Sequence, residues 1–404
     1  MKTNFILYLI FLLLLITSCS SCKPAEESVA NIDVTKNYPE KVILLTDIAN
    51  ITYLHLHTDD DNYLYAGRID YVTKNTVVVV DRSSSSILLF SKDGAPKSRF
   101  NHLGQGPGEY AIAPEVIYDE TADEVFVHNN RRTVLVYSSS GEHKRTIQLA
   151  QEITRIESII DFDDHSLFFF DFSIEDKGNG LLMEGANISV ENHILPFYRI
   201  SKTTGEVLDY VELSGNKLLL KMFYNERWHF VPRYFAVKCP EGVLLCNAQT
   251  DTIFLYSNNK SLSPVFFKAP SAKSQKQIEY LFLCLDRGLY QFIQVNLLTD
   301  GVAPIFLPAK YYLRNKKTGE TVRPKFHLPD YKDKEFIMNQ WRPNANGIAA
   351  RDGVFTNDGY CFELDLFELK QACRDNKLNG KLKELVESLN EDEDNNVFML
   401  VDFK

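Results

Sequence analysis

Two histidines and a short acidic run, early in the chain, are the side chains that come closest to a metal-binding pattern. His55 and His57 alternate along a segment with strand-like patterning, so their side chains share one face. No third ligand stands nearby, and the acidic run at 59–62 lacks the glycine and the distal glutamate of an EF-hand calcium loop. Leu54 and Leu56 supply the buried face of this segment, so we expect both histidines to face solvent and predict no metal site.

A glycine-rich stretch invites comparison with phosphate-binding loops. Its characteristic residues are Gly104, Gly106, Pro107, Gly108, Glu109 and Tyr110. A phosphate cradle needs a strand before the glycines and a helix N-terminus after them. Here residues 111–114 (AIAP) and then a further strand follow instead. We therefore predict a tight turn between two repeat units, in which glycine allows positive φ and proline fixes φ, and no nucleotide or other cofactor.

The sequence shows no nucleophile of a recognisable kind. It contains no GxSxG elbow, and its many carboxylates cannot be paired in space from the sequence alone. Beyond Cys19 and Cys22 the cysteines are dispersed singly, so we expect buried free thiols, although export would permit disulfides. We therefore predict no catalytic residue and favour a binding protein over an enzyme.

Composition narrows the class of protein. The chain has 404 residues with 45% hydrophobic and 24% charged residues, which are ordinary globular values and exclude a disordered or fibrous chain. Its formal net charge of −10 argues against nucleic-acid binding, which needs clustered lysine and arginine. Tyrosine and phenylalanine are abundant, at 20 and 27 residues against 5 methionines, and aromatic side chains favour strands.

An internal repeat organises most of the chain. Residues 77–100 and 124–147 share one pattern: an apolar strand, a polar turn, a strand ending in an aromatic residue, an x-Gly turn and an amphipathic strand. Small antiparallel units of this kind bury their faces by stacking radially, and a period of about 45 residues is typical of propeller blades. We therefore predict an all-β fold, a six-bladed β-propeller with short helical insertions. The expected blades are 67–101, 114–149, 155–213, 231–268, 289–328 and 345–403.

Other segments refine this architecture. An insertion is expected near 173–196, between the strands of the third blade. The strand-like segment 51–57 has no blade of its own, so we expect it to pair into the last blade and close the ring. Residues 274–285 and 378–389 carry apolar residues at helical spacing, and we expect both to form helices packed on blade edges.

Arginines near the starts of the predicted innermost strands are the candidate ligand-binding residues. The set, with one carboxylate that could hold the first arginine in place, is Arg68, Asp70, Arg155, Arg233 and Arg351. The arginines come from four expected blades, so they could meet at the mouth of the central channel. Guanidinium groups suit carboxylate or sulfate, which would indicate an acidic sugar or a carboxylated peptide. The alternative is that these arginines pair with carboxylates or carbonyls of the channel itself.

The first residues have the pattern of an export signal. Lys2 precedes an apolar run at 5–16, which is too short to span a bilayer and suits a signal peptide. Residues 16–19 (ITSC) resemble the bacterial lipobox, in which the cysteine receives lipid. We expect a signal peptide at 1–18, lipidated Cys19 with a flexible tether at 19–40, and the propeller at 41–404. Ordinary secretion with a free Cys19 is the alternative.

Several motifs together resemble one family. The series GRID (67–70), VVVVDR (77–82), KDG (92–94) and GQGPGEY (104–110) is similar to the six-bladed β-propeller lipoproteins of Bacteroidetes, which are relatives of NHL-type propellers. The last ten residues, 395–404, resemble the closing strand of that family. The resemblance is strongest over 51–150 and extends over nearly the whole mature chain. It implies a six-bladed propeller on a lipid anchor and implies no established reaction.

The function expected from these features is binding at the cell envelope. The protein would be a lipoprotein held to the membrane by its lipid anchor, on the periplasmic face or the outer surface of the outer membrane. Its ligand would be a glycan, a peptide or a protein partner, and not a nucleic acid. The competing class is a hydrolase or lyase that acts on a sugar or lactone in the central funnel. A convergent metal site or acid–base pair in the funnel would favour that enzyme.

The lipobox generates a direct test. We expect Cys19 to be the lipidated N-terminus of the mature protein, because lipidation and cleavage before the cysteine occur together at a lipobox. The intact mass of the N-terminal peptide measures this. Recovery of unmodified Cys19, or of Met1 in the mature protein, would contradict the assignment.

Overall fold

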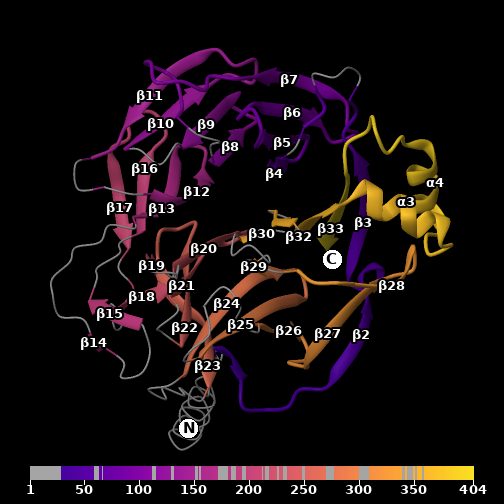
Figure 1. Ribbon diagram of the computed structural model, residues 1–404. Helices are drawn as coiled ribbons and strands as arrows, with labels where there is room; N and C mark the ends of the chain where they lie inside the picture. Colours follow the sequence, from indigo (N-terminus) through magenta and orange to yellow (C-terminus); the bar gives the residue numbers. More distant parts are fainter. Residues whose placement is uncertain are drawn as a thin grey trace, which may run out of the picture.

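Six antiparallel blades surround a central axis in the computed structural model of the chain (Figure 1). The model describes residues 29–404 with internal gaps. The gaps are 59–62, 66, 112–114, 129–131, 151–152, 154–155, 172–180, 183–187, 193–196, 212, 214–217, 225–226, 231–233, 248–250, 270–276, 300–308, 339–341, 344–348, 351–352 and 357–358. The prediction of an all-β six-bladed propeller is confirmed.

The first three blades each contain four strands in order from the axis outward. Blade 1 consists of β4 (Gly67–Val72), β5 (Thr76–Asp81), β6 (Ile87–Ser91) and β7 (Pro96–Phe100). Blade 2 consists of β8 (Glu115–Asp119), β9 (Glu124–His128), β10 (Thr133–Tyr137) and β11 (His143–Gln148). Blade 3 consists of β12 (Ile156–Asp163), β13 (Ser166–Asp171), β16 (Phe197–Ser201) and β17 (Val207–Val211).

The other three blades follow the same plan with additions. Blade 4 consists of β20 (Tyr234–Cys239), β21 (Gly242–Asn247), β22 (Thr252–Ser257) and β23 (Leu262–Ala269). Blade 5 consists of β24 (Gln277–Arg287), β25 (Tyr290–Thr299), β26 (Ala309–Asn315) and β27 (Thr321–Leu328), and β28 (Tyr331–Phe336) pairs with β27. Blade 6 consists of β31 (Gly353–Phe355), β32 (Gly359–Leu364), β33 (Val397–Phe403) and the N-terminal strand β3 (Ala49–His55).

The apolar run of β5 shows why its sequence forms a middle strand. Val77 to Val80 are all buried, although side chains of a strand point alternately to opposite faces. Val78 and Val80 pack with side chains of blade 2, whereas Val77 and Val79 pack with side chains of blade 6. A strand covered on both faces favours a continuous apolar run over an alternating one. Each blade therefore depends on both neighbours for the burial of its middle strands.

Glycine appears where the third strand of a blade turns into the fourth. Gly94, Gly141, Gly205 and Gly319 occupy this turn with φ of 92°, 89°, 76° and 74°. These values lie in the left-handed region that side chains disfavour, which explains the repeated x-Gly pattern. Blade 4 places Lys260 at the equivalent position, with φ of 63°.

The N-terminal segment crosses the outer edges of three blades. β1 (Ala30–Asp33) adds to β23 in parallel, and β2 (Glu40–Leu44) adds to β27 in parallel. A short helix, α2 (Leu45–Ile48), leads into β3. The segment expected as a tether, 19–40, thus contains β1, and the chain joins the propeller before residue 41.

The ring closes by pairing of the two ends of the propeller, as we expected for the strand at 51–57. β3 pairs antiparallel with β33, from Ala49 opposite Phe403 to His55 opposite Val397. The expectation is confirmed, because the last blade takes three strands from the C-terminal region and one from the N-terminal region.

The two helix predictions have different outcomes. The helix expected at 378–389 is confirmed as α4 (Gly380–Ser388), and it packs beside a helix that was not expected, α3 (Leu366–Arg374). The helix expected at 274–285 is wrong, because β24 occupies this region. β24 pairs with β25 from Gln277 to Arg287. Leu281 and Leu283 are buried two residues apart, and beyond a bulge at Cys284 the side chain of Leu285 is buried on the opposite face. The fifth blade therefore begins earlier than 289.

The insertion expected in the third blade is also present. β14 (Leu181–Leu182) and β15 (Ile188–Asn192) lie between β13 and β16 in the chain. They form a separate sheet with β18 (Leu218–Tyr224) and β19 (Arg227–Phe230). A further pair, β29 (Arg342–Pro343) with β30 (Ala349–Ala350), precedes blade 6.

Deletion of 397–404 tests the closure. The deletion removes β33, including Phe398, Leu400 and Val401, of which at most 4% of the surface is exposed. Because each such truncation costs about 2–5 kcal/mol, the sum approaches the whole stability of a domain, and we expect cooperative unfolding to be lost. Urea denaturation followed by circular dichroism measures this.

A chain that starts at residue 36 is the control. It loses only β1, which adds a fifth strand to an already complete blade, so we expect a lower midpoint and a retained sharp transition. If the chain lacking 397–404 unfolds as sharply and at the same midpoint as the parent, the closure does not support the ring.

Candidate functional site

The two faces of the ring differ in how the strands are connected. The first strands β4, β8, β12, β20 and β24 contact one another in chain order, so they lie innermost. In an antiparallel blade, the turns that join strands one to two and three to four then share one face. We call it the short-turn face, since its turns are brief, as at 240–241 and 288–289. The other connections share the opposite side, which we call the long-connection face.

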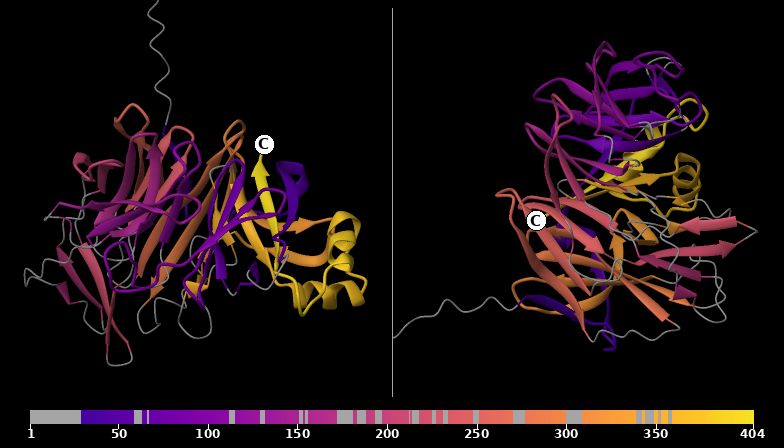
Figure 2. Two further views of the ribbon diagram at one scale, coloured as in Figure 1. Left: turned by 90° about the horizontal axis from the view of Figure 1, so that it is seen from above. Right: turned by 90° about the vertical axis from the view of Figure 1, so that its left-hand side faces the viewer.

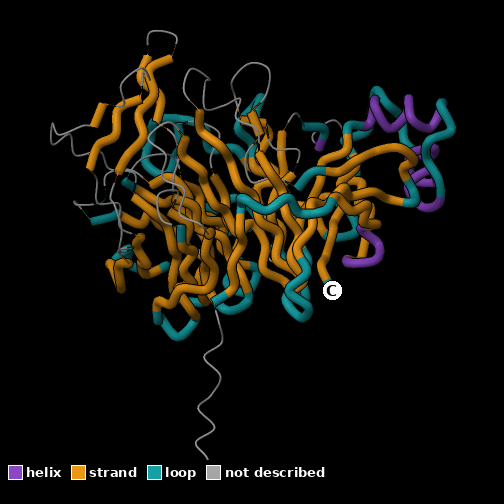
Figure 3. Tube along the Cα trace, turned by 90° about the horizontal axis from the view of Figure 1, so that it is seen from below, coloured by secondary structure: helices purple, strands orange, loops and turns teal. Residues whose placement is uncertain are grey.

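The long-connection face carries the additions to the propeller. The connection between β32 and β33 contains α3 and α4, and the one between β13 and β16 contains β14 and β15. β18 and β19 lie between blades 3 and 4, and β28 lies between blades 5 and 6. The side views place α3 and α4 on the side of the ring opposite the C-terminus (Figures 2 and 3).

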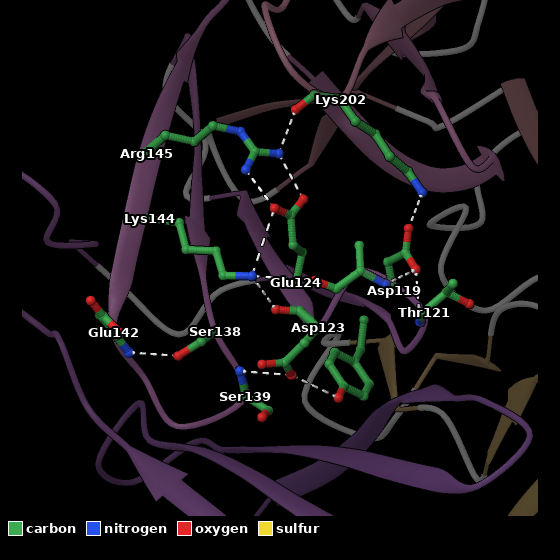
Figure 4. Close-up of polar contacts among 12 residues, drawn as sticks. Asp119, Thr121, Asp123, Glu124, Ser138, Ser139, Glu142, Lys144, Arg145 and Lys202 are labelled. Carbon is green, nitrogen blue, oxygen red and sulfur yellow. Dashed lines mark hydrogen bonds and ion pairs between the residues drawn. The ribbon is translucent and has the colours of Figure 1, made fainter.

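A buried ion-pair network lies on the short-turn face between blades 2 and 3. Lys202 Nζ stands 2.6 Å from Asp119 Oδ2 and 2.8 Å from Asp161 Oδ1, and the lysine side chain is only 5% exposed. Nearby, both terminal nitrogens of Arg145 donate to Glu124, at 2.6 and 2.7 Å, and Arg145 Nη2 also donates to the Lys202 carbonyl at 2.8 Å (Figure 4). The charged groups of this network are thus paired with one another.

The pKa directions in the network follow from burial and from these pairs. Burial raises the pKa of the Asp119 carboxyl, but hydrogen bonds from Lys202 and from backbone N–H groups outweigh it and hold the pKa below its usual value. Burial dominates at Asp161 and raises its pKa even though Lys202 opposes this. Burial opposes the charge on Lys202, but its two carboxylates raise its pKa overall. The network therefore joins two blades, and we assign it a structural role.

A cleft on the long-connection face differs from this network, because its charges are not all paired with one another. It lies between β28, β32 and α3 and has a volume of about 440 Å³. Its apolar floor consists of Tyr331, Phe336, Phe362, Leu364 and Leu369. Its polar residues are Lys334, Glu335, Glu363, Asp365 and Glu368.

Local interactions fix the walls of this cleft. The Asp365 side chain caps α3 by accepting from the Glu368 backbone N–H at 2.9 Å. Asn396 accepts from the Leu366 N–H at 3.0 Å and donates through Nδ2 to Glu363 Oε1 at 2.9 Å. The helix start and one carboxylate of the cleft are thus held by the segment that leads into β33.

Aromatic packing holds the opposite wall. Phe336 of β28 meets Phe362 of β32 edge to face, with ring centroids 5.4 Å apart. Lys334 Nζ lies 5.7 Å from the centroid of the Tyr331 ring and 3.5 Å from Glu368 Oε2. The cleft therefore combines an aromatic floor, four carboxylates and one ammonium group.

The arginines expected at the channel mouth cannot be placed. Arg155, Arg233 and Arg351 lie outside the described residues, as does the side chain of Arg68, so their grouping stays a prediction. Asp70 is half-buried, and its carboxylate accepts a hydrogen bond from the Val116 N–H at 3.2 Å, which ties β4 to β8. Cys19 also lies outside the described residues, and its lipidation stays a prediction.

The glycine-rich stretch forms a turn between blades 1 and 2. The Gly106 N–H donates to Glu109 Oε2 at 2.6 Å, and a Cβ on Gly104 would lie 2.0 Å from the same oxygen. Gly108 has φ of 75°. Tyr110 is fully buried, and its hydroxyl donates to the Ser85 carbonyl at 2.9 Å. The stretch thus fastens one blade to the next.

The two histidines differ from each other. His57 is exposed, whereas the side chain of His55 is only 10% exposed and stands 3.2 Å from Asp394 Oδ1. The expectation that both face solvent is wrong for His55, because the segment before β33 folds over it. Burial lowers the pKa of His55, and Asp394 opposes this. Among the described residues, no three histidine, cysteine or acidic side chains gather in a way that could hold a metal ion.

Among the described residues no cysteine forms a disulfide, and most of the thiols are buried, as expected. They are Cys239, Cys246, Cys284, Cys361 and the partly exposed Cys373. In the described part of the chain, no helix has the length and apolarity needed to cross a bilayer.

Sequence reasoning missed every residue of the cleft. One signal could have indicated α3: Asp365 followed by Glu368 matches a capping pattern, and Leu366, Leu369 and Ala372 follow at helical spacing. The approach of β28 to this helix had no local signal, since it depends on how blades 5 and 6 meet.

A family model and several solved structures resemble this chain over most of its length. A family model described as "Domain of unknown function (DUF4934)" matches residues 29–402. A Bacteroides fragilis protein named as a candidate exported protein superposes with a TM-score of 0.55 at 16% identity, over 91% of this chain and 99% of that one. A member of the DUF4221 family from Bacteroides vulgatus gives a TM-score of 0.45 at 11% identity, over 88% and 97%. No curated protein matches the chain.

The buried network yields a stability prediction. Replacement of Lys202 by Met leaves Asp119 and Asp161 without their cation, and breaking a buried ion pair costs about 3–5 kcal/mol. We expect a correspondingly lower free energy of unfolding in urea. The matched control is Lys316→Met, which breaks a more exposed pair with Asp286 and should hardly move the midpoint. Equal effects of the two substitutions would contradict the structural role.

Proposed function

Since the chain belongs to the DUF4934 family, whose description names no activity, we propose its function from its own geometry. The protein is an exported lipoprotein of the cell envelope, and its long-connection face binds a glycan, peptide or protein partner. The observation that carries this proposal is that the inserted elements and the cleft lie on only one of the two faces. One face has brief turns and a self-paired ion network, and the other has the inserted helices, the inserted strands and the cleft. Binding residues concentrate on such connections above a rigid scaffold.

The direction of β1 adds support for the orientation of the protein on a membrane. β23 runs from the turn at 258–261 on the short-turn face toward the opposite face, and β1 is parallel to it. Ala30 therefore lies nearer to the short-turn face than Asp33. A lipid on Cys19 would then attach from the short-turn side, and the long-connection face would point away from the membrane.

Site-specific photocrosslinking in the native cell tests the proposal. A benzophenone amino acid replaces Phe367 on α3, which is 62% exposed, or Leu289 in a short turn, which is 48% exposed. Benzophenone reacts with C–H bonds of proteins and glycans alike, so it reports either kind of partner. We expect crosslinked adducts from position 367 and none from position 289, because the partner binds the long-connection face. Adducts of equal yield at both positions, or at 289 alone, would contradict a partner on the long-connection face.

A further inference from the structure

The residues that line the cleft between β28, β32 and α3 indicate which class of ligand it binds. We propose that it binds a basic side chain of a peptide partner, a lysine or arginine flanked by apolar residues. This inference rests on the proposed function, since it places one part of the partner on the long-connection face. It also differs from the acidic ligand that the arginines of the channel mouth would select.

The shape and lining of the cleft suit an amphiphilic group. Its volume of about 440 Å³ lies in the range that takes small ligands. Tyr331, Phe336 and Phe362 are exposed by 8%, 4% and 3%, so the floor is part of the packed core. Only a group that reaches between the polar residues can contact this floor. A long side chain with an apolar stem and a charged end has that form.

The charge of the cleft selects a cation. Four carboxylate residues and one lysine line the cleft, so its lining carries a net negative charge. Glu363 is half-buried and positioned by Asn396, and Asp365 is fixed by its capping hydrogen bond. Ammonium and guanidinium groups form strong hydrogen bonds with carboxylates, whereas an anionic ligand would be repelled.

The protein's own lysine shows how a cation fits. Lys334 Nζ lies over the Tyr331 ring, and cations are attracted to the face of an aromatic ring. Its pair with Glu368 is exposed, at 41% for the lysine and 65% for the glutamate, and exposed pairs contribute little stability. A ligand cation can therefore displace Lys334 from Glu368 and Tyr331 at little cost.

An exposed aromatic ring beside the cleft lining, on the same turn of α3, favours a peptide over a simple amine. Phe367 lies one residue before Glu368 on α3, outside the lining of the cleft, and is 62% exposed. A residue next to the basic side chain can cover this ring, which a small amine cannot reach. The occupant is thus a peptide with an apolar residue beside a lysine or arginine.

Three matched tripeptides test the inference by isothermal titration calorimetry with the full-length mature protein in detergent. They are acetyl-Phe-Lys-Phe-amide and the same peptide with Gln or Glu in the centre. We expect the lysine peptide to bind roughly tenfold more tightly than the glutamine peptide, because it gains a charge-assisted contact, and the glutamate peptide to bind most weakly. Equal affinities for the three peptides, or no heat with the lysine peptide at millimolar concentration, would overturn the inference.

Variants locate the binding. Glu363→Gln and Glu335→Gln each remove a charge from the cleft, and each should weaken the lysine peptide by about three- to tenfold. Glu384→Gln removes the same charge from an exposed position of α4 outside the cleft and should leave the affinity unchanged. Equal weakening by all three variants would overturn the assignment to the cleft.

The crosslinking experiment separates this inference from the proposed function. If the cleft is right, the double variant Glu335→Gln with Glu363→Gln loses the adducts formed from position 367. If adducts persist at full yield in the double variant, a partner still binds the long-connection face, and the cleft is not its site.

Discussion

Burial of both faces of every blade is the constraint on which the whole structure depends. Val77 and Val78 are adjacent in β5, but they pack against different blades, one toward blade 6 and the other toward blade 2. A blade at an open end would leave one of these sets in water, at roughly 25 cal/mol for each Å² of apolar surface. The pairing of β3 with β33 removes that end, so one antiparallel strand pair secures the burial of all six blades.

This constraint fixes some parts of the chain and leaves the length and structure of others free to vary. Strand positions are fixed by packing from both sides, and the short turns are fixed by the geometry of adjacent strands. The long connections are limited only by their end points, so they can hold helices and an extra sheet without disturbing the ring. The binding role that we propose therefore belongs to the connections, and the propeller supplies their rigid support.

Charged groups have two different roles in this molecule. Lys202 is surrounded by carboxylates that it neutralises, and burial makes this arrangement costly to break but leaves nothing for a ligand. In the cleft the carboxylates outnumber the single ammonium group, and that group is held by an exposed pair. The cleft thus has an excess of negative charge beside buried aromatic rings, which suits a ligand. The network around Lys202 has paired charges, which suits stability.

The sequence by itself determined the blades, because their signals are local. The alternation along β3, the apolar run of β5 and the x-Gly turns at Gly94 and Gly141 each reflect the geometry of neighbouring residues. It misled at 274–285, where apolar residues at helical spacing lie in a strand that is buried on both faces and pairs along its length with β25.

Only the tertiary structure decided which side chains meet. Asp119 and Lys202 belong to different blades, and the cleft joins Tyr331 of β28 to Glu368 of α3 across the boundary of blades 5 and 6. Such contacts arise from how sheets stack around the axis, and no spacing along the chain records them. The sequence therefore specified the scaffold, whereas its ion network and its candidate binding site exist only once the ring has closed.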